Sequence, residues 1–241
     1  MIVDKERKVI YLHNPKCGGT FLRDIYIKKY GQTDATKWWK LFSKEYDTDL
    51  GHISYDDLPR FVPEWKDYRL IVMVRNPYNR FYSAVKELRK QVKPVKVALI
   101  IKVPECFFYE YHEWNLLKKI YEIFRYICPW TYINHLLKLT CVSTDDFCKQ
   151  VFCFKRVRQD YFLRNKQFPW LNPQSYFMGK KVEVLRYESF SDWAILLDAF
   201  GLSEYNSQLK IVKDYDIPES IREMIRSLYP EDSLLFDLYT N

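Results

Sequence analysis

Hydrophobic and polar positions along the chain follow two different periods, and the change from one to the other predicts the order of strands and helices. Short apolar runs at 8–13, 69–74 and 181–186 are typical of buried strands. Apolar residues at helical spacing predict helices in these segments: 21–30, 36–46, 78–91, 192–200, 219–229 and 232–239, with a short turn or helix at 56–61. Strands that alternate with helices favour an α/β fold, in which a parallel sheet is flanked by helices on both faces.

Capping and helix-breaking residues set several of these boundaries. Asn76-Pro77 ends the second strand and starts a helix, because proline in the first turn loses no hydrogen bond. Ser143 opens a run that is typical of a helix N-terminus, and Gly201 is placed to end the helix before it. We therefore expect helix boundaries at these three places.

The middle of the chain, residues 91–170, differs from the rest in its many aromatic residues. Aromatic residues make up 18% of the sequence, and many of them lie between 107 and 132. Helical spacing across 107–139 places most of these rings in the core, and the remainder could line a ligand cavity. With 241 residues, 6 glycines and no flexible linker, the chain is predicted to form one domain, 1–241, with a helical, aromatic-rich insertion in its middle.

A glycine-containing motif, NPKCGGT at 14–20, follows the first predicted strand and leads into a helix. Glycine lets the backbone curl so that successive N–H groups converge on one anion, and the helix adds the positive end of its dipole. The hydroxyl of Thr20 and the ammonium of Lys16 can bind the same anion. The lysine precedes the glycines and no GK[ST] follows, so the motif is not a Walker A loop.

A second polar motif, RNPYNRFYS at 75–83, follows the next predicted strand. Arg75 at the end of the strand can bind a phosphate through two parallel hydrogen bonds, and Ser83, about two helical turns later, can face the same oxygens. Arg80 is equally well interpreted as a solvated helix residue. Ligands bind at the carboxyl ends of parallel strands, so two anion sites on neighbouring strands suggest a ligand with phosphate at both ends.

Net charge and cysteine spacing narrow the function classes. A net charge of +7 agrees with an anionic ligand, and because Lys and Arg are spread along the chain without a zinc-finger or RNP signature, we expect no nucleic-acid partner. The 6 cysteines form no metal-binding cluster, which predicts reduced thiols and no metal site. No signal peptide is visible, and the apolar run at 97–103 is too short to span a bilayer, so the expected location is cytoplasmic.

The motifs resemble those of sulfotransferases that use 3′-phosphoadenosine 5′-phosphosulfate (PAPS). PKCGGT resembles the 5′-phosphosulfate loop of this family, and RNPYNRFYS resembles its 3′-phosphate motif. GHISYDDLPRF, at 51–61, is similar to the segment before the same strand in heparan and uronyl 2-O-sulfotransferases and their bacterial relatives, in which a histidine serves as base. Residues 182–202 resemble the late strand and helix of the family, and EDSLLFDLY resembles its C-terminal ending.

The resemblance implies a P-loop-like sheet and a set of binding residues. The 5′-phosphosulfate would be held by Lys16, Cys17, Gly18, Gly19, Thr20 and Phe21. Arg75 and Ser83 would hold the 3′-phosphate, and Tyr187 would lie near the adenine. Cys17 departs from the small or hydroxyl residues usual in the family, but a loop that binds through backbone N–H groups tolerates it. PAPS would be the sulfuryl donor and 3′,5′-adenosine bisphosphate (PAP) the product, with no metal required.

The chemistry of sulfuryl transfer assigns roles to a lysine and a histidine. Positioning and charge stabilisation do most of the work, so Lys16 would neutralise the charge that develops on the leaving phosphate oxygen. A histidine suits the removal of the acceptor proton. Among the four histidines, His52 matches the family base, His13 lies close to the first motif, and His112 and His135 fall in the helical middle. We therefore predict His52 as the base.

Several alternatives stay open on the sequence alone. The acceptor is a hydroxyl by default, but an N–H remains possible, and either a compact ring-bearing or glycosidic molecule or an anionic polysaccharide would fit. A P-loop-type nucleotide-dependent kinase shares the strand, glycine loop and helix, and a non-catalytic module that binds an anionic nucleotide would need Lys16 and Arg75 but not His52. RNA binding is the weakest alternative. The residues fit a monomer or a homodimer.

Overall fold

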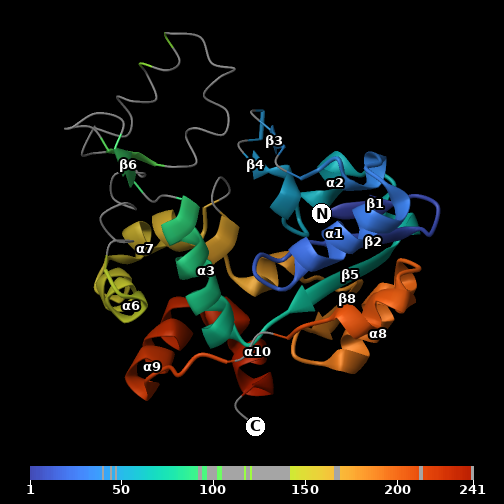
Figure 1. Ribbon diagram of the computed structural model, residues 1–241. Helices are drawn as coiled ribbons and strands as arrows, with labels where there is room; N and C mark the ends of the chain where they lie inside the picture. Colours follow the sequence, from blue (N-terminus) through green and yellow to red (C-terminus); the bar gives the residue numbers. More distant parts are fainter. Residues whose placement is uncertain are drawn as a thin grey trace.

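The computed structural model describes residues 1–39, 41–43, 45–46, 48–91, 94–96, 102–104, 117, 120, 142–165, 169–211 and 214–239. The predicted helices across 107–139 therefore lie outside the described residues, apart from single positions, and so does most of the insertion expected at 91–170. What is described is an α/β arrangement, in which a sheet is flanked by helices (Figure 1).

The central sheet has the strand order β1-β2-β5-β8. Its members are β1 (Ile2–Asp4), β2 (Val9–Leu12), β5 (Arg69–Val74) and β8 (Val182–Arg186). The three strands predicted from their apolar runs are confirmed, and they pair in parallel. The sheet is nevertheless mixed, not wholly parallel, because β1 pairs antiparallel with β2. A strand of three residues is too short to display a period, which is why the sequence did not reveal it.

Opposite faces of the sheet bury different side chains, because successive residues of a strand point to opposite sides. Tyr11, Ile71 and Met73 pack beneath two helices, α1 (Gly19–Tyr30) and α8 (Phe190–Ala199). On the other face, Leu12 and Val72 pack with residues around the short helix α2 (Leu58–Phe61). The central strands are therefore covered on both faces, as their continuous apolar runs predicted.

A second group of helices lies beyond the sheet and has its own hydrophobic core. Its members are α3 (Pro77–Gln91), α6 (Thr144–Phe152), α7 (Arg156–Leu163), α9 (Glu219–Leu228) and α10 (Ser233–Leu238). Figure 1 shows α6, α7 and α9 on the side of α3 that faces away from the sheet. Since α3 starts directly after β5, it connects the end of the central strand to this second group.

Most predicted helix boundaries are confirmed. Ser143 accepts a hydrogen bond from the N–H of Asp146 at the start of α6, and Gly201 ends α8 with a φ of 62° and a bond from Leu202 N to Leu197 O of 2.7 Å. The helix α7 was not predicted. Shorter 3₁₀ helices connect these elements: η1 (Asp34–Thr36), η2 (Leu50–His52), η3 (Trp65–Asp67), η6 (Pro169–Leu171), η7 (Gln174–Phe177), η8 (Ser203–Gln208) and η9 (Pro230–Asp232).

The helix predicted at 36–46 is wrong. The segment contains the end of η1, a turn, and the strand β3 (Phe42–Ser43), which pairs antiparallel with β4 (Thr48–Asp49). Trp39 stacks on the ring of His13, with 5.9 Å between ring centroids. This tertiary contact requires the segment to bend over the end of the sheet, and tertiary contacts routinely override a helical period.

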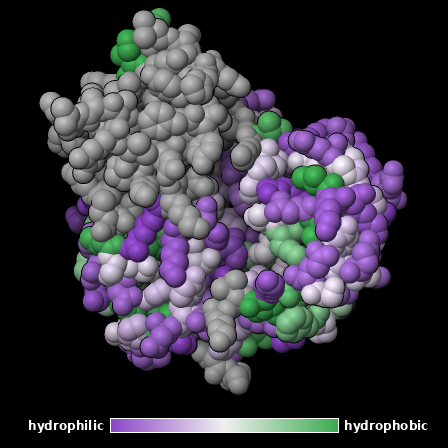
Figure 2. Space-filling model, in the orientation of Figure 1, coloured by the Kyte–Doolittle hydropathy of each residue, from purple (hydrophilic) through white to green (hydrophobic). Residues whose placement is uncertain are grey.

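A separate antiparallel pair is formed by β6 (Pro94–Lys96) and β7 (Lys102–Pro104). On the described part of the face shown in Figure 2, hydrophilic side chains predominate and hydrophobic ones form small separate patches. Of the helices in the described ranges, none combines the length and the apolar character that a membrane span needs.

Candidate functional site

A cavity of about 640 Å³ opens where β2 and β5 end. The loop between β2 and α1 forms one side of it, and the start of the β5–α3 segment forms another. Its lining brings together residues from distant parts of the sequence: His13, Lys16, Gly18, Gly19, Thr20, Trp39, Asp49, His52, Arg75, Ser83, Glu87, Trp170 and Tyr187. The position agrees with the general location of ligands at the carboxyl ends of strands in α/β sheets.

The backbone of the loop after β2 is shaped to bind an anion. Lys16 and Gly18 both adopt left-handed conformations, with φ values of 67° and 87°. Turns of this kind direct successive N–H groups into one concavity. Gly18 is the N-cap of α1 and supplies no side-chain hydrogen bond to the first turn, so the first N–H groups of the helix are available to a ligand.

The two glycines of the loop are also required by packing. A Cβ atom on Gly18 would lie 2.5 Å from the ring of Trp193, and one on Gly19 would lie 2.1 Å from the ring of His13. No side chain fits at either distance. The glycines therefore let α1 approach α8 and the end of β2 closely, in addition to any role in binding.

Arg75 places a buried guanidinium in the wall of the cavity. The residue is 3% exposed, and its Nη1 donates to the carbonyl oxygen of Lys16 at 3.4 Å. The guanidinium carbon lies 4.7 Å from the centre of the Tyr187 ring, a cation–π contact. Its Nε and Nη2 atoms are buried and have no hydrogen-bond partner among the described residues. Buried donors without acceptors are costly, so this group is arranged for an anion that would accept from both nitrogens.

Lys16 and Glu87 face each other across the cavity. Lys16 Nζ lies 2.9 Å from Glu87 Oε2, and Glu87 is one helical turn beyond Ser83 on α3. The two side chains are 26% and 21% exposed, so the pair is part-buried, and both residues line the cavity. A phosphate that enters the cavity can therefore reach the lysine.

His52 is oriented by a backbone carbonyl. Its Nδ1 lies 2.9 Å from the carbonyl oxygen of His13, and because the carbonyl can only accept, Nδ1 carries the proton and Nε2 keeps a lone pair. Burial lowers the pKa of His52 below its ordinary value, which keeps the ring neutral near pH 7. The result is a neutral imidazole that can accept a proton at Nε2.

The rings of His13, His52 and Trp39 pack against one another. The centroid of the His13 ring is 4.2 Å from that of His52, and burial, with a smaller contribution from His52, lowers the pKa of His13 well below its ordinary value. A neutral His13 adds no positive charge beside His52. His13 therefore serves as the support of His52, through its carbonyl and its ring.

Most side chains that the sequence predicted for the site do line the cavity. They are Lys16, Gly18, Gly19, Thr20, His52, Arg75, Ser83 and Tyr187. His112 and His135, the two histidines that the sequence places in the helical middle, lie outside the described residues. Within those residues, no group of three or more His, Cys, Asp or Glu side chains is placed to hold a metal ion.

Two predicted binding residues have side chains outside this lining. Cys17 is fully buried, with Sγ 3.6 Å from the carbonyl oxygen of Pro15, and burial raises the pKa of its thiol to about 12. Phe21 packs against the edge of Trp193, with 5.7 Å between ring centroids. Phe21 can offer a ligand only its backbone N–H, whereas the N–H of Cys17 already donates to the carbonyl oxygen of Asn14 at 3.4 Å.

Arg80 is buried, so its interpretation as a solvated helix residue is wrong. It is 3% exposed, and its Nε donates to the carbonyl oxygen of Pro15 at 3.2 Å. It lies outside the cavity lining, and its hydrogen bond to Pro15 supports the loop after β2 on the side away from the cavity.

Sequence reasoning missed Gln174, which connects the two motifs. Its Oε1 accepts from Asn14 Nδ2 and from the backbone N–H of Arg75, each at 2.9 Å, and its Nε2 donates to the carbonyl oxygen of Arg75 at 2.7 Å. Asp232 in turn accepts from the backbone N–H of Gln174 at 3.0 Å. A single glutamine far along the chain carries no pattern by which the sequence could have identified it. The other missed lining residues are Trp39, Asp49, Glu87 and Trp170.

Comparisons with protein-family models, with curated proteins and with solved structures find no match.

Proposed function

We propose that the protein is a sulfotransferase that transfers the sulfuryl group of PAPS to a hydroxyl of a small-molecule or glycan acceptor. The observation that carries this proposal is the buried guanidinium of Arg75, in the same cavity as the glycine loop, because its Nε and Nη2 atoms lack partners in the part of the chain that the structure describes. A cavity with an anion site on each of two adjacent strands suits a nucleotide with phosphate at both ends. The resemblance of both motifs to PAPS-dependent sulfotransferases, with a P-loop-like sheet, supports the same conclusion.

The donor would lie across the ends of β2 and β5. Backbone N–H groups of Lys16, Gly18, Gly19 and Thr20 would bind its 5′-phosphosulfate, since that of Cys17 donates to the carbonyl oxygen of Asn14. Arg75 with Ser83 would bind its 3′-phosphate. Tyr187, which already lies under Arg75, offers an aromatic surface to the adenine. The cavity volume of about 640 Å³ falls within the usual range for ligand pockets.

Two side chains would carry the chemical step. The acceptor oxygen forms a bond to sulfur while the bond from sulfur to the phosphate oxygen breaks, and the electron pair of that bond stays on the phosphate. His52 Nε2 takes the acceptor proton and later releases it to solvent, since its Nδ1 is committed to the carbonyl of His13. Lys16 leaves Glu87 to neutralise the charge on the leaving oxygen.

Donor-dependent turnover tests this proposal. The protein is incubated with PAPS and a mixed panel of phenols, sugars and amines, and the release of PAP is followed by chromatography. We expect the release to depend on an acceptor and to fall by about a hundredfold in Lys16→Ala, which removes the stabilisation of the leaving group. Release that is equal in Lys16→Ala and the wild type would contradict the assigned role of the lysine.

A non-catalytic nucleotide-binding module is distinguished by His52→Ala. In an enzyme, this variant should keep its affinity for PAP and lose turnover by about a hundredfold or more. A binding module would show no acceptor-dependent turnover in either form.

A further inference from the structure

A second cavity, of about 280 Å³, touches the same histidine that lines the donor cavity. His52 is the one residue that the described linings of the two cavities share. In an in-line transfer the acceptor approaches the sulfur from the side opposite the leaving oxygen, and a base must reach both the acceptor and the reacting centre. A base with one cavity for the donor and a second beside it meets this requirement.

We propose that this second cavity binds the acceptor, and that the acceptor is a compact, uncharged polyol of the size of a sugar ring. The inference rests on the proposed function, because it takes His52 as the base. A volume of about 280 Å³ lies just below the range typical of drug-sized ligands, which limits the bound part of the acceptor to a small unit.

Hydrogen-bonding groups in this cavity suit hydroxyls. Asp56 and Asp57 both line it, and Ser54 donates to Asp57 Oδ2 at 2.8 Å. Asn172 also lines it, is 5% exposed, and has a buried Oδ1 atom that accepts no hydrogen bond from any described residue. Carboxylates and a carboxamide accept from O–H groups, and an unsatisfied buried amide is stabilised by a ligand that donates to it.

Aromatic residues form another part of the same lining. Tyr176 and Phe177 come from η7, the 3₁₀ helix that also carries Gln174; Tyr176 is partly exposed, whereas Phe177 is 1% exposed and packs in the core. Ring faces pack against the C–H groups of a sugar while carboxylates and amides bind its hydroxyls, so the two kinds of group together are suited to a polyol.

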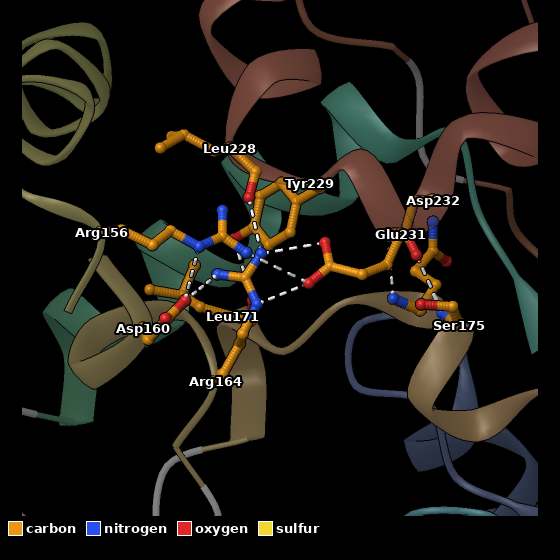
Figure 3. A network of polar contacts seen from close by, with 10 residues as sticks. Arg156, Asp160, Arg164, Leu171, Ser175, Leu228, Tyr229, Glu231 and Asp232 are labelled. Carbon is orange, nitrogen blue, oxygen red and sulfur yellow. Dashed lines mark hydrogen bonds and ion pairs between the residues drawn. The ribbon is translucent and has the colours of Figure 1, made fainter. Parts of the chain in front are cut away.

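The one cation in the described lining, Arg164, is already neutralised. Its guanidinium donates to both carboxylate oxygens of Glu231, at 2.7 and 2.9 Å, to Asp160 at 2.9 Å and to the carbonyl oxygen of Leu228 at 2.8 Å. Figure 3 shows the guanidinium of Arg164 held between these groups, with Arg156 against Asp160. Arg164 thus braces the wall and is committed to its own carboxylates.

The charge around the second cavity therefore opposes an anionic acceptor. Asp57 is paired with Arg60 at 3.0 Å, whereas Asp56 is exposed at the cavity. A sulfated or uronate-containing chain would meet carboxylates and would find Arg164 occupied. Of the two acceptor classes that the sequence left open, this lining favours the uncharged glycosidic one.

Two matched probes test the proposal: methyl glucoside, and methyl glucuronide, which adds a carboxylate to the same ring. Binding to the PAP-loaded wild-type protein is measured by saturation-transfer NMR. We expect the glucoside to bind more tightly than the glucuronide. Asn172→Leu should weaken the glucoside about tenfold, because it removes the buried hydrogen-bonding group, while its affinity for PAP stays unchanged.

A second variant, at an exposed position, keeps the test valid if Asn172→Leu fails to fold. Asp56→Lys, at an exposed position, should raise the affinity for the glucuronide roughly threefold. Glu223→Lys, which makes the same charge change at an exposed position of α9 outside both cavity linings, should have no effect.

The outcomes separate this inference from the proposed function. The acceptor assignment would be overturned if the wild type bound the glucuronide or a phenol more tightly than the glucoside. It would also be overturned if Asn172→Leu bound the glucoside as tightly as the wild type. In either case, PAP binding would still support the donor site. A wild-type protein that fails to bind PAP would overturn both.

Discussion

Arg75 is the residue on which the donor site depends. Its guanidinium is 3% exposed, contacts Tyr187 and the carbonyl of Lys16, and leaves two buried nitrogens without acceptors. A protein that needed only a structural cation at this point would gain by pairing it with a carboxylate. The missing acceptors are those that a phosphate would supply.

Replacing Arg75 with lysine keeps the charge and removes the planar fork. We expect Arg75→Lys to weaken PAP by about tenfold or more, and to leave 5′-AMP nearly unchanged, because only PAP carries the 3′-phosphate. Calorimetric titration measures both. Arg69→Lys is the control, since Arg69 begins the same strand but is exposed and pairs with Glu183. Equal losses for both ligands would place Arg75 outside the 3′-phosphate site.

The protonation of His52 predicts the pH dependence of turnover. The base is active when neutral, and burial lowers the pKa of His52 below the ordinary histidine value of 6.5. Activity should therefore rise with pH through a pKa below 6.5 and be level at neutral pH. The rate of PAP release at saturating donor and acceptor, measured against pH, should show this limb in the wild type. His52→Gln should lack it, and a limb that persisted there would belong to another group.

At the scale of elements, the turn between β2 and α1 is held in place by packing contacts on the side that faces away from the cavity. Gly18 touches the ring of Trp193, which donates from Nε1 to the carbonyl of Tyr187 at 2.8 Å. The loop is thereby fixed against α8 and against the end of β8. An anion site of backbone N–H groups requires such rigid support.

Gly18→Ala and Gly31→Ala separate packing from backbone strain. Both glycines have positive φ, 87° and 79°, but a Cβ atom meets Trp193 at 2.5 Å in the first case and nothing within 4 Å in the second. Gly31→Ala should lower the free energy of unfolding by about 1–2 kcal/mol. Gly18→Ala should add roughly 1–3 kcal/mol for overpacking and should also weaken PAP. Urea unfolding measures the difference, and equal losses in the two variants would mean that Trp193 yields without cost.

The elements that the sequence predicted correctly are those whose secondary structure is determined by residues within the element itself. The apolar runs of β2 and β5, the proline at the start of α3 and the glycine after α8 act locally, so their patterns are visible in one sequence. The segment 36–46 failed because the position of Trp39 is decided by the ring of His13, a contact that no local period encodes.

At the scale of the whole molecule, Gln174 joins the sheet, the loop and the C-terminal helices. Its side chain bonds Asn14 and both backbone groups of Arg75, and its N–H bonds Asp232 before α10. The two predicted anion motifs are therefore held in one relative position by a residue that belongs to neither.

Gln174→Leu removes these side-chain bonds and leaves buried polar groups unpaired. We expect the free energy of unfolding to fall by about 2–4 kcal/mol, from an order of 1–3 kcal/mol for each unsatisfied group. PAP affinity should fall by about tenfold, because the loop and Arg75 lose their common support. Gln159→Leu, whose amide bonds only the carbonyl of Phe152 at 3.1 Å, is the control and should change neither. Unfolding and titration of the same samples would show whether stability and binding change together.

The sequence could predict those residues of the candidate site that lie directly next to the ends of strands. Lys16, Arg75, Ser83 and His52 lie in short motifs next to strand ends, and the topology of a parallel sheet brings such ends together. The ion pair of Glu87 with Lys16 depends on how α3 packs beside the loop, which a single sequence does not reveal. The same holds for the second cavity, which is assembled from β4, η2 and the segment after it, the residue after α7, η6, the turn that follows η6, and η7.

The most direct measurement is a calorimetric titration of the wild-type protein with PAP, 5′-AMP and ATP, the last with and without Mg²⁺. The central claim is that Arg75 with Ser83 and the glycine loop bind the two phosphate ends of one nucleotide. We predict tight binding of PAP, much weaker binding of 5′-AMP, and no gain for ATP when Mg²⁺ is added. Equal binding of all three, or a preference for ATP with Mg²⁺, would contradict the 3′-phosphate site and favour a nucleotide-dependent kinase.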